Sequence, residues 1–319
     1  MREFELIKNY FSKISKKNKF ALNLNDDIFF DKNKGIAISV DTYNLGYHFI
    51  DFKHPDLVIK KILRSSISDL ICKGVIPKFY FIAGSGNNKT FSKKNLSLIS
   101  KSLTQEQNKY NISLCGGDTT FSNKLSFTVT SLGYSKKIVY RNKALINDDI
   151  YVTGDLGDSF MGLQILKNKI KVSKQLKNYF TQKYYLPDIP IKLTKKLLNF
   201  ANSSIDLSDG LIDDLSKMIN NQNLSFYLNE NKIPISKNLL KIIKMKTMKK
   251  IKLVSNGDDY QILFTASKDK SRIIAQTCKN LGIKISKIGR ICSNKKRSVI
   301  IDEKGKEIVL KNKGYVHQF

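Results

Sequence analysis

Aspartates gather at a few places in a chain that otherwise contains few acidic residues. The 319 residues include 27 Asp and Glu, and Asp recurs where expected strands end or helices begin. Six segments carry this pattern: NLNDD (23–27), SVDTYNLGYHF (39–49), SISDL (66–70), CGGDTT (115–120), SIDLSDGLIDD (204–214) and SNGDDY (255–260). Turn formation and helix capping explain any one segment, but clustered carboxylates repel one another unless cations neutralise them. Oxygen ligands suit Mg²⁺, which commonly bridges to substrate phosphates, so the six segments together indicate phosphoryl chemistry.

Two glycine segments could approach a phosphate closely. Gly117 precedes Asp118, and a backbone without Cβ allows such an approach while the adjacent Asp could hold a metal. TGDLGDS (153–159) lies between an expected strand and helix, which is typical of a phosphate cradle at a helix N-terminus. Both segments are also ordinary turn sequences, and neither matches the two common nucleotide-loop patterns. The alternatives of cradle and structural turn stay open for both.

The usual groups of nucleophilic catalysis are scarce. The chain has three histidines and contains neither a GxSxG nor an HExxH motif. His48 lies in an acid-rich, glycine-containing segment. It either contributes to a functional site or is simply exposed to solvent. We therefore expect no covalent nucleophile and no general base, and a metal-assisted transfer instead.

The elements that must position these residues alternate between strands and helices. The first half predicts strands at 35–40, 79–84 and 125–134 and helices at 56–73 and 92–110. The second half predicts strands at 149–154 and 260–266, helices at 158–168, 193–203, 211–222 and 269–281, and a hairpin over 298–310. This pattern indicates an α/β protein of two domains, residues 1–138 and 139–319, joined near 135–149.

The net charge of +29 raises a second class of function, nucleic-acid binding. The basic residues are 50 Lys and only 6 Arg, and the lysines are spread along the whole chain. Arg is preferred for bidentate recognition of phosphate or guanine, so the pattern favours a solvated surface over a dedicated nucleic-acid face.

Cysteine usage and hydropathy bear on the compartment. The four cysteines are widely spaced without a CxxC motif, which speaks against a disulfide framework and a structural zinc site. No apolar run approaches the roughly 20 residues that span a bilayer. The N-terminal segment indicates a short amphipathic helix rather than a secretory signal. We therefore expect a cytoplasmic protein without a membrane segment.

The ordered motifs resemble thiamine-monophosphate kinase. They are NDD, SxDT…GxHF, SDL…G, GGDTT, YVTGxxGDS…GL, SIDLSDGLxDDL, GDDY and a terminal KGY, and they cover about residues 3–319. This resemblance implies a two-domain fold like that of aminoimidazole-ribotide synthetase, with an N-terminal domain that dimerises through its sheet. It also implies phosphorylation of thiamine monophosphate to thiamine diphosphate, with ATP as donor and several Mg²⁺ ions.

The resemblance assigns roles residue by residue. Metal ligands would be Asp27, Ser39, the backbone at Val40, Asp41, Asp69, Asp118, Asp206 and Asp209. ATP would contact Gly117, Asp118, Arg141 and Ser208, and thiamine monophosphate would contact His48, Asp258 and Asn312. No nucleic acid or membrane partner is implied.

This chain departs from the family pattern at several positions. The first acid pair follows NLN rather than glycines, GGEDYE becomes NGDDYQ, and Ser66 stands where Asn is frequent. Asn312 occupies a position that is often aromatic. The nearest alternative is another ATP-using enzyme of the same superfamily. A selenophosphate synthetase fits poorly, because its reactive Cys lies in an N-terminal loop whereas Cys72 falls within an expected helix.

Overall fold

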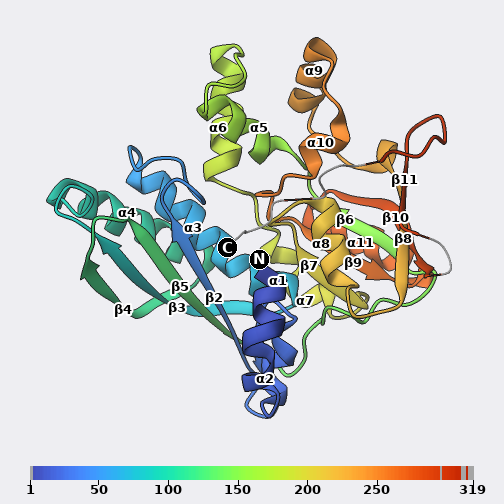
Figure 1. Cartoon of the computed structure of the whole chain (residues 1–319), viewed down its shortest axis with the longest axis horizontal. Coiled ribbons are helices and arrows are strands. Elements are labelled where there is room, and N and C mark those ends of the chain that lie inside the picture. The colour runs from blue at the N-terminus through green and yellow to red at the C-terminus, as the bar shows by residue number, and fades with distance from the viewer. Residues whose placement is uncertain (1–2, 295–296, 310–313, 315–319) are drawn as a thin grey trace.

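The computed structural model describes residues 3–294, 297–309 and 314. Within these residues two β-sheets form, each with helices packed on it, and they lie side by side (Figure 1). Strands up to Tyr134 build the first sheet, and strands from Asp149 onward build the second. The α/β prediction is therefore confirmed, while the domain boundary at 138/139 stays a prediction.

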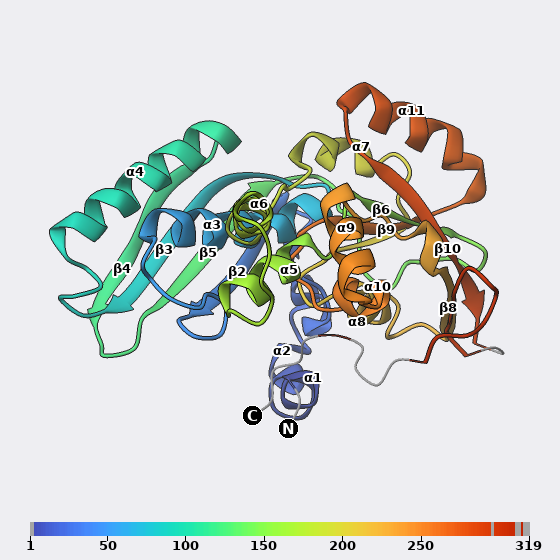
Figure 2. The ribbon, with the colours of Figure 1, turned by 90° about the horizontal axis from the view of Figure 1, so that it is seen from above.

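The first sheet has the strand order β1-β2-β5-β3-β4. Its strands are β1 Phe29–Asp31, β2 Ile36–Asn44, β3 Ile76–Gly86, β4 Ser113–Phe121 and β5 Ser126–Tyr134. All neighbouring pairs are antiparallel except β3 and β4, which run parallel. Helix α3 (Pro55–Cys72) packs on β2, β3 and β5, and α4 (Lys93–Tyr110) packs on α3, so both lie on one side of the sheet (Figure 2).

Helix α3 illustrates why the local sequence folds as it does. Its apolar residues recur at helical spacing, and Ile59, Ile62, Leu63 and Ile67 are all fully buried. Pro55 stands in the first turn, where its missing N–H costs nothing. Gly74 follows the helix with a φ of +81°, a backbone conformation that favours glycine. The helix predicted over 56–73 is confirmed within two residues.

The opposite face of the first sheet is open. Side chains alternate along β2, so that Val40 is 62% exposed while Ser39 is buried toward the helices. Phe81 in β3 is 42% exposed, and Tyr134 in β5 is also exposed. The edge strand β4 is exposed along its whole length. Within the residues that the structure describes, a broad and partly apolar sheet face therefore has no intramolecular cover.

The second sheet has the order β11-β8-β10-β6-β9-β7. Its strands are β6 Asp149–Thr153, β7 Ser203–Asp206, β8 Leu224–Asn229, β9 Ile262–Ala266, β10 Ile285–Ser293 and β11 Val299–Ile301. Helices α8 (Leu211–Met218) and α10 (Lys250–Val254) share a core with one face of this sheet. Helix α11 (Ser271–Leu281) packs on the other face over β6 and β9, in the cluster that also contains residues of α3.

Three further helices form a layer that stands above the sheets in Figure 1. They are α5 Asp158–Leu166, α6 Lys174–Tyr185 and α9 Lys237–Lys246, and they share one apolar cluster. Helix α6 also contacts α3, which ties this layer to the first sheet. The shorter helical pieces include α1 Glu3–Leu6, a π-helical turn Ile7–Phe11, α2 Ser12–Ser15 and α7 Thr194–Leu197.

Most predicted elements are confirmed, and two helices are wrong over part of their length. The helix predicted for 211–222 ends at Met218. The helix predicted for 193–203 ends at Leu197, because Ser203 already pairs with Thr265 as the first residue of β7. The strands β1, β4, β7, β8 and β10 and the helices α6, α9 and α10 were not predicted. The hairpin predicted for 298–310 forms as far as it is described, with Gly305 in the turn.

Candidate active site

Three carboxylates from both sheets meet between them. Asp41 lies in β2, Asp69 in α3 and Asp206 at the end of β7. Burial, and after it the charge of Asp206, raises the pKa of Asp41 from 3.8 to about 7. Burial and the charge of Asp41 raise the pKa of Asp69 well above its usual range. Burial also raises the pKa of Asp206. The shifts mean that the fold concentrates negative charge here, which the nearby cations Lys73 and Arg141 offset only in part.

Hydroxyl groups, rather than cations, contact these three carboxylates. The Ser39 hydroxyl donates to Asp69, and the Ser68 hydroxyl donates to Asp206. Tyr43 donates to Asp41 with an oxygen–oxygen distance of 3.2 Å. In the part of the chain that the structure describes, none of the three carboxylates forms an ion pair.

Asp27 lies beside this cluster, but its charge is already paired. One of its oxygens is within 4.8 Å of a carboxylate oxygen of Asp206. Lys73, which is fully buried, contacts Asp26 at 2.8 Å and Asp27 at 2.7 Å. The guanidinium of Arg141 also contacts Asp27, with its Nε at 3.2 Å. The predicted nucleotide ligand Arg141 thus holds the predicted metal ligand Asp27.

The loop after β7 adds a second acidic group. Asp209, Asp213 and Asp214 place one carboxylate oxygen each within 4.8 Å of one another, and Lys217 forms ion pairs with all three. Asp214 accepts the backbone N–H of Asp209 at 3.0 Å, which anchors the start of α8. The charge of Asp209 contributes to the raised pKa of Asp206, although burial contributes more.

The predicted nucleotide residue Ser208 packs directly against the predicted substrate segment. Its carbonyl oxygen accepts the backbone N–H of Asp258 at 2.8 Å. A Cβ on Gly257 would come within 2.0 Å of the same carbonyl oxygen, so the approach of the two loops requires glycine there. The glycine before Asp258 in SNGDDY therefore has a structural explanation.

His48 and Asp258 lie on one side of the cluster and share neighbours. Asp258 forms an ion pair at 2.9 Å with Lys61, a buried residue of α3. The Lys61 ammonium lies 3.9 Å from the ring centroid of Tyr184, and the Tyr184 hydroxyl donates to the carbonyl of His48. The His48 ring accepts the backbone N–H of Asn44 at its Nδ1, over 3.0 Å. One chain of contacts thus links the two predicted substrate residues across both halves of the protein.

Asp118 does not join the carboxylates within one chain. It pairs with Ala83 of β3, which pairs with Thr128 of β5, which in turn pairs with Thr42 of β2. Asp118 is thus three strand spacings, or about 14 Å, away from Thr42. Because side chains alternate, Asp118 lies on the open face with Thr42, whereas Asp41 points toward the helices. Its predicted role as a ligand of metal and ATP stays a prediction.

Gly117 and Val40 also have structural explanations. A Cβ on Gly117 would come within 1.8 Å of the carbonyl oxygen of Ile82, so the neighbouring strand requires glycine there. GGDTT is part of strand β4 rather than a turn. Val40 turns its side chain to the open face, which leaves only its backbone beside Asp41. Asn312 lies outside the described residues.

The TGDLGDS segment binds a carboxylate of the chain itself. The backbone N–H of Gly157 donates to both oxygens of Asp259, at 3.0 and 2.9 Å. Asp158 accepts hydrogen bonds from the hydroxyls of Tyr179 and Ser236, both at 2.7 Å. These contacts favour the structural-turn interpretation over the phosphate cradle.

Sequence reasoning missed four residues that hold this site together. Lys73 and Lys61 are buried cations between the two halves, and Ser68 and Tyr43 donate to the central carboxylates. Among 50 lysines nothing in the sequence distinguishes these two.

Comparison with known proteins identifies the family. The thiamine-monophosphate kinase of Buchnera aphidicola subsp. Acyrthosiphon pisum is 36% identical over 327 residues, which cover 99% of this chain and 98% of that protein. This chain belongs to the thiamine-monophosphate kinase family. The enzymes of that name from Escherichia coli K12 and Bacillus subtilis are 30% and 27% identical, again over 99% of this chain. A family model described as AIR synthase related protein, N-terminal domain, matches residues 24–135.

Solved structures agree with this family fold. The thiamine monophosphate kinase from Aquifex aeolicus superposes with a TM-score of 0.79 at 24% identity, over 97% of this chain and 99% of that one. A chain described as AaThiL complexed with AMPPCP and TMP gives a TM-score of 0.85 over 99% of this chain and 97% of that chain, also at 24% identity. The chain is thus a kinase of the thiamine-monophosphate kinase family, with the family's two-sheet fold.

Proposed function

We propose that this kinase transfers the γ-phosphoryl group of ATP directly to thiamine monophosphate, with Mg²⁺, and so makes thiamine diphosphate in thiamine biosynthesis. Membership of the family supports the reaction. The observation that carries the mechanism is the meeting of Asp41, Asp69 and Asp206 without a cation on any of them in the described structure. The complex with AMPPCP and TMP that the related AaThiL forms supports the choice of ligands.

The residues present fit magnesium. Around the three central carboxylates the donors are oxygens, namely carboxylates and the hydroxyl of Ser39, which is the ligand type that Mg²⁺ prefers. The raised pKa of Asp41 shows that its negative charge is costly as long as no cation balances it. Asp27 lies close enough to Asp206 to contribute, and Asp209 extends the group toward α8.

The acceptor chemistry explains why the site needs no general base. The nucleophile is an oxygen of a phosphate monoester, which is already anionic near neutral pH. The difficulty is to bring two polyanions together, and Mg²⁺ supplies the charge that offsets their repulsion and stabilises the transferring group. The chain contributes position: Asp41 of strand β2, Asp69 of helix α3 and Asp206 of strand β7 would hold the metal that keeps the reacting groups in line.

The remaining roles are assigned by family resemblance and by position. We propose that His48 and Asp258 contact thiamine monophosphate, since one chain of contacts links them at the edge of the cluster. Ser208 and Arg141 would contact ATP. For Arg141 to reach a phosphate, at least one of the nitrogens that now contact Asp27 has to change partner. We further propose a cytoplasmic location, supported by the scattered cysteines of the chain.

We also propose a homodimer formed through the open face of the first sheet. That face exposes Val40, Phe81 and Tyr134, and apolar side chains of this kind are typical of an interface. Gly117 and Asp118 lie on its edge strand. A partner on this face would surround Asp118, which the single chain leaves exposed, and would give it a closed environment for binding ATP and metal.

Purified protein incubated with ATP, Mg²⁺ and thiamine monophosphate tests this function. Chromatography should detect thiamine diphosphate and ADP in equal amounts. Asp69→Asn should lower the rate by at least a hundredfold, whereas Asp269→Asn, which changes an exposed acid of the same type, should leave it unchanged. Folded wild-type protein that makes no thiamine diphosphate would refute the proposal.

A further inference from the structure

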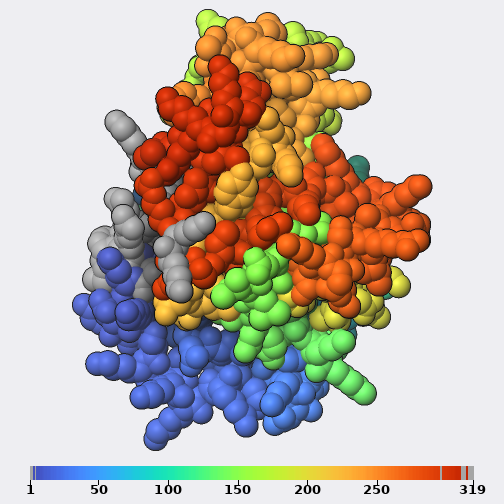
Figure 3. Space-filling model, turned by 90° about the vertical axis from the view of Figure 1, so that its right-hand side faces the viewer, coloured from blue at the N-terminus to red at the C-terminus, as the bar shows by residue number. Residues whose placement is uncertain are grey.

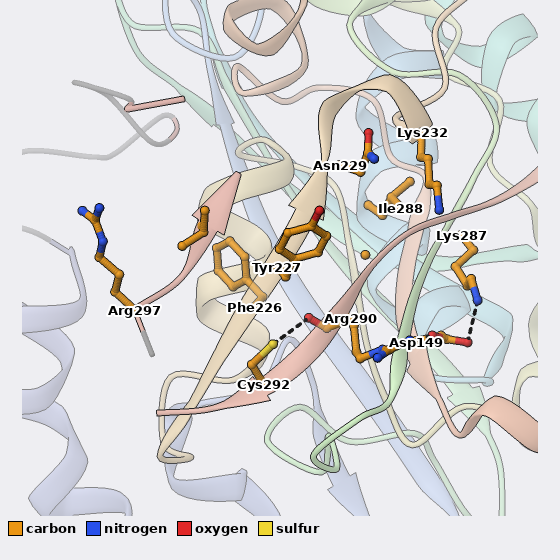
Figure 4. Close-up of a pocket in the computed structure, with 12 residues that line it drawn as sticks. Asp149, Phe226, Tyr227, Asn229, Lys232, Lys287, Ile288, Arg290, Cys292 and Arg297 are labelled. Carbon is orange, nitrogen blue, oxygen red and sulfur yellow. Dashed lines mark hydrogen bonds and ion pairs between the residues drawn. The ribbon is translucent and has the colours of Figure 1, made fainter. Parts of the chain in front are cut away.

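A cavity of about 390 Å³ lies on the second sheet, away from the carboxylates. It opens over β8, β10 and β11 and the start of β6, on the side of the molecule that Figure 3 shows. The residues around it are Asp149, Phe226, Tyr227, Asn229, Lys232, Lys287, Ile288, Gly289, Arg290, Cys292, Arg297 and Val299 (Figure 4). A volume of this size suits a small organic molecule.

The charge around this cavity is predominantly positive. Among the described residues, Asp149 is the one acid that lines it, and it is 2% exposed. Its carboxylate contacts Lys287 at 3.1 Å and Arg290 at 3.9 Å, so one buried acid anchors two cations at the cavity wall. Arg297 pairs with Glu307 at 2.6 Å. Lys232 has no carboxylate partner among the residues that the structure describes. An excess of positive charge therefore faces the cavity.

The floor of the cavity also offers a flat apolar surface. Tyr227 of β8 pairs with Arg290 on one side and with Val299 on the other. Side chains that are directly paired across strands lie on the same face of a sheet, so these three form one row. Tyr227 is 39% exposed, which leaves part of its ring open to a ligand. Cations thus lie beside an aromatic surface.

This cavity is separate from the carboxylate site. Asp206 pairs with Ile262 at one end of β9, whereas Asp149 pairs with Ala266 at the other end. Ile262 and Ala266 are four residues apart, so the two ends of β9 are about 13 Å apart. The cavity begins on β6, the next strand after β9, and extends to β11. One ligand of modest size therefore cannot occupy both places.

We propose that this cavity is a second binding site, for a small organic phosphate. The phosphate group pairs with Lys232, Lys287 and Arg290, and a ring or other flat apolar part lies against Tyr227. Arg290 provides planar paired donors, and its contact with Asp149 limits the rotamers that binding has to fix. The site does not depend on the transfer reaction, because it shares no residue with the carboxylate cluster.

Calorimetric titration with phenyl phosphate, in EDTA so that no metal complex forms, tests the proposal. The wild type should bind one equivalent at this cavity. Lys287→Gln/Arg290→Gln should weaken the binding at least tenfold. The matched control is Arg272→Gln/Lys279→Gln, which removes one Arg and one Lys from the exposed side of α11 and should bind like the wild type. Equal weakening in both double variants would show general electrostatic attraction and overturn the proposal.

Two further variants keep the test decisive if the loss of both cations from Asp149 destabilises the fold. Lys232→Gln removes a cation without a carboxylate partner and should weaken phenyl phosphate binding several-fold in a fully folded protein. Tyr227→Ala should weaken the binding of phenyl phosphate but not that of inorganic pyrophosphate. A crystal structure with phenyl phosphate should show it against Tyr227, and unchanged affinity in both variants would refute the site.

Discussion

Replacing Asp41 by Asn should stabilise the metal-free protein while it removes a group that the proposed reaction needs. Burial and the charge of Asp206 raise the pKa of Asp41 to about 7, so its ionised form is disfavoured in the folded state. Asn keeps the shape of the side chain and removes the charge. The site would thus be built at a cost in stability that a bound cation offsets.

The magnitude follows from the pKa shift. A rise from 3.8 to about 7 is about 3 units, or about 4 kcal/mol at 1.36 kcal/mol per unit. Because Asp41 is only partly buried by its surface area, solvent screening reduces this to about 2 kcal/mol. For a chain of this length, 2 kcal/mol corresponds to a rise in Tm of about 3 °C.

The stability gained by Asp41→Asn should depend on pH, because Asp41 takes up a proton within the accessible range. The folded state binds this proton more tightly than the unfolded state, so the stabilising contribution of the protonated group is complete below about pH 4. It is lost as the pH rises to about 7. The advantage of Asp41→Asn should therefore grow over that range, level off above pH 7, and at pH 5 be less than half its value at pH 8.

Thermal and urea unfolding in EDTA at pH 5 and pH 8 measure this effect. Asp269→Asn, at an exposed acid, should change the unfolding free energy by less than about 0.5 kcal/mol. Addition of MgATP should raise the Tm of the wild type by mass action and should have little effect on Asp41→Asn. A variant that is less stable than the wild type at pH 8, or a gain that does not depend on pH, would refute the reasoning.

Four further outcomes follow from the structure and the proposed function. Thiamine monophosphate should be phosphorylated and free thiamine should not, as measured by chromatography, because no general base is expected to activate an alcohol. Phe81→Lys should convert the proposed dimer to a monomer in light scattering, because it places a charge on the open sheet face. Lys61→Met should raise KM for thiamine monophosphate more than it lowers kcat, since Asp258 loses its ion-pair partner. Binding to duplex DNA in fluorescence anisotropy should be weak and should vanish at physiological salt, because the lysines are dispersed.

The sequence predicts best where periodicity and local chemistry agree. Helix α3 follows from its apolar spacing and from Gly74, and the same helix carries Asp69 to the centre of the site. Asp41 directly follows the β-branched run predicted as a strand over 35–40 and lies in β2. Asp206 ends the short strand β7, whose sequence Ser-Ser-Ile-Asp was not predicted as a strand. The structure brings these three predicted residues together, although their role as metal ligands stays a prediction.

Long-range features could not be predicted in this way. Whether GGDTT is a loop or an edge strand depends on its pairing with β3, and this pairing places Asp118 about 14 Å from the level of Asp41. The partner of the Gly157 amide is Asp259, which lies 102 positions away in the chain. Lys73 contacts groups from both halves of the chain, and no local signal separates it from the many exposed lysines.

A transfer of labelled phosphate tests the central claim most directly. With ATP that carries ³²P at the γ-position, Mg²⁺ and thiamine monophosphate, the label should appear in the terminal phosphate of thiamine diphosphate. No labelled protein intermediate should form, EDTA should abolish the transfer, and Asp69→Asn should reduce it by at least a hundredfold. Label that passes through the protein, or transfer that continues at full rate in EDTA, would contradict direct metal-assisted transfer at this carboxylate cluster.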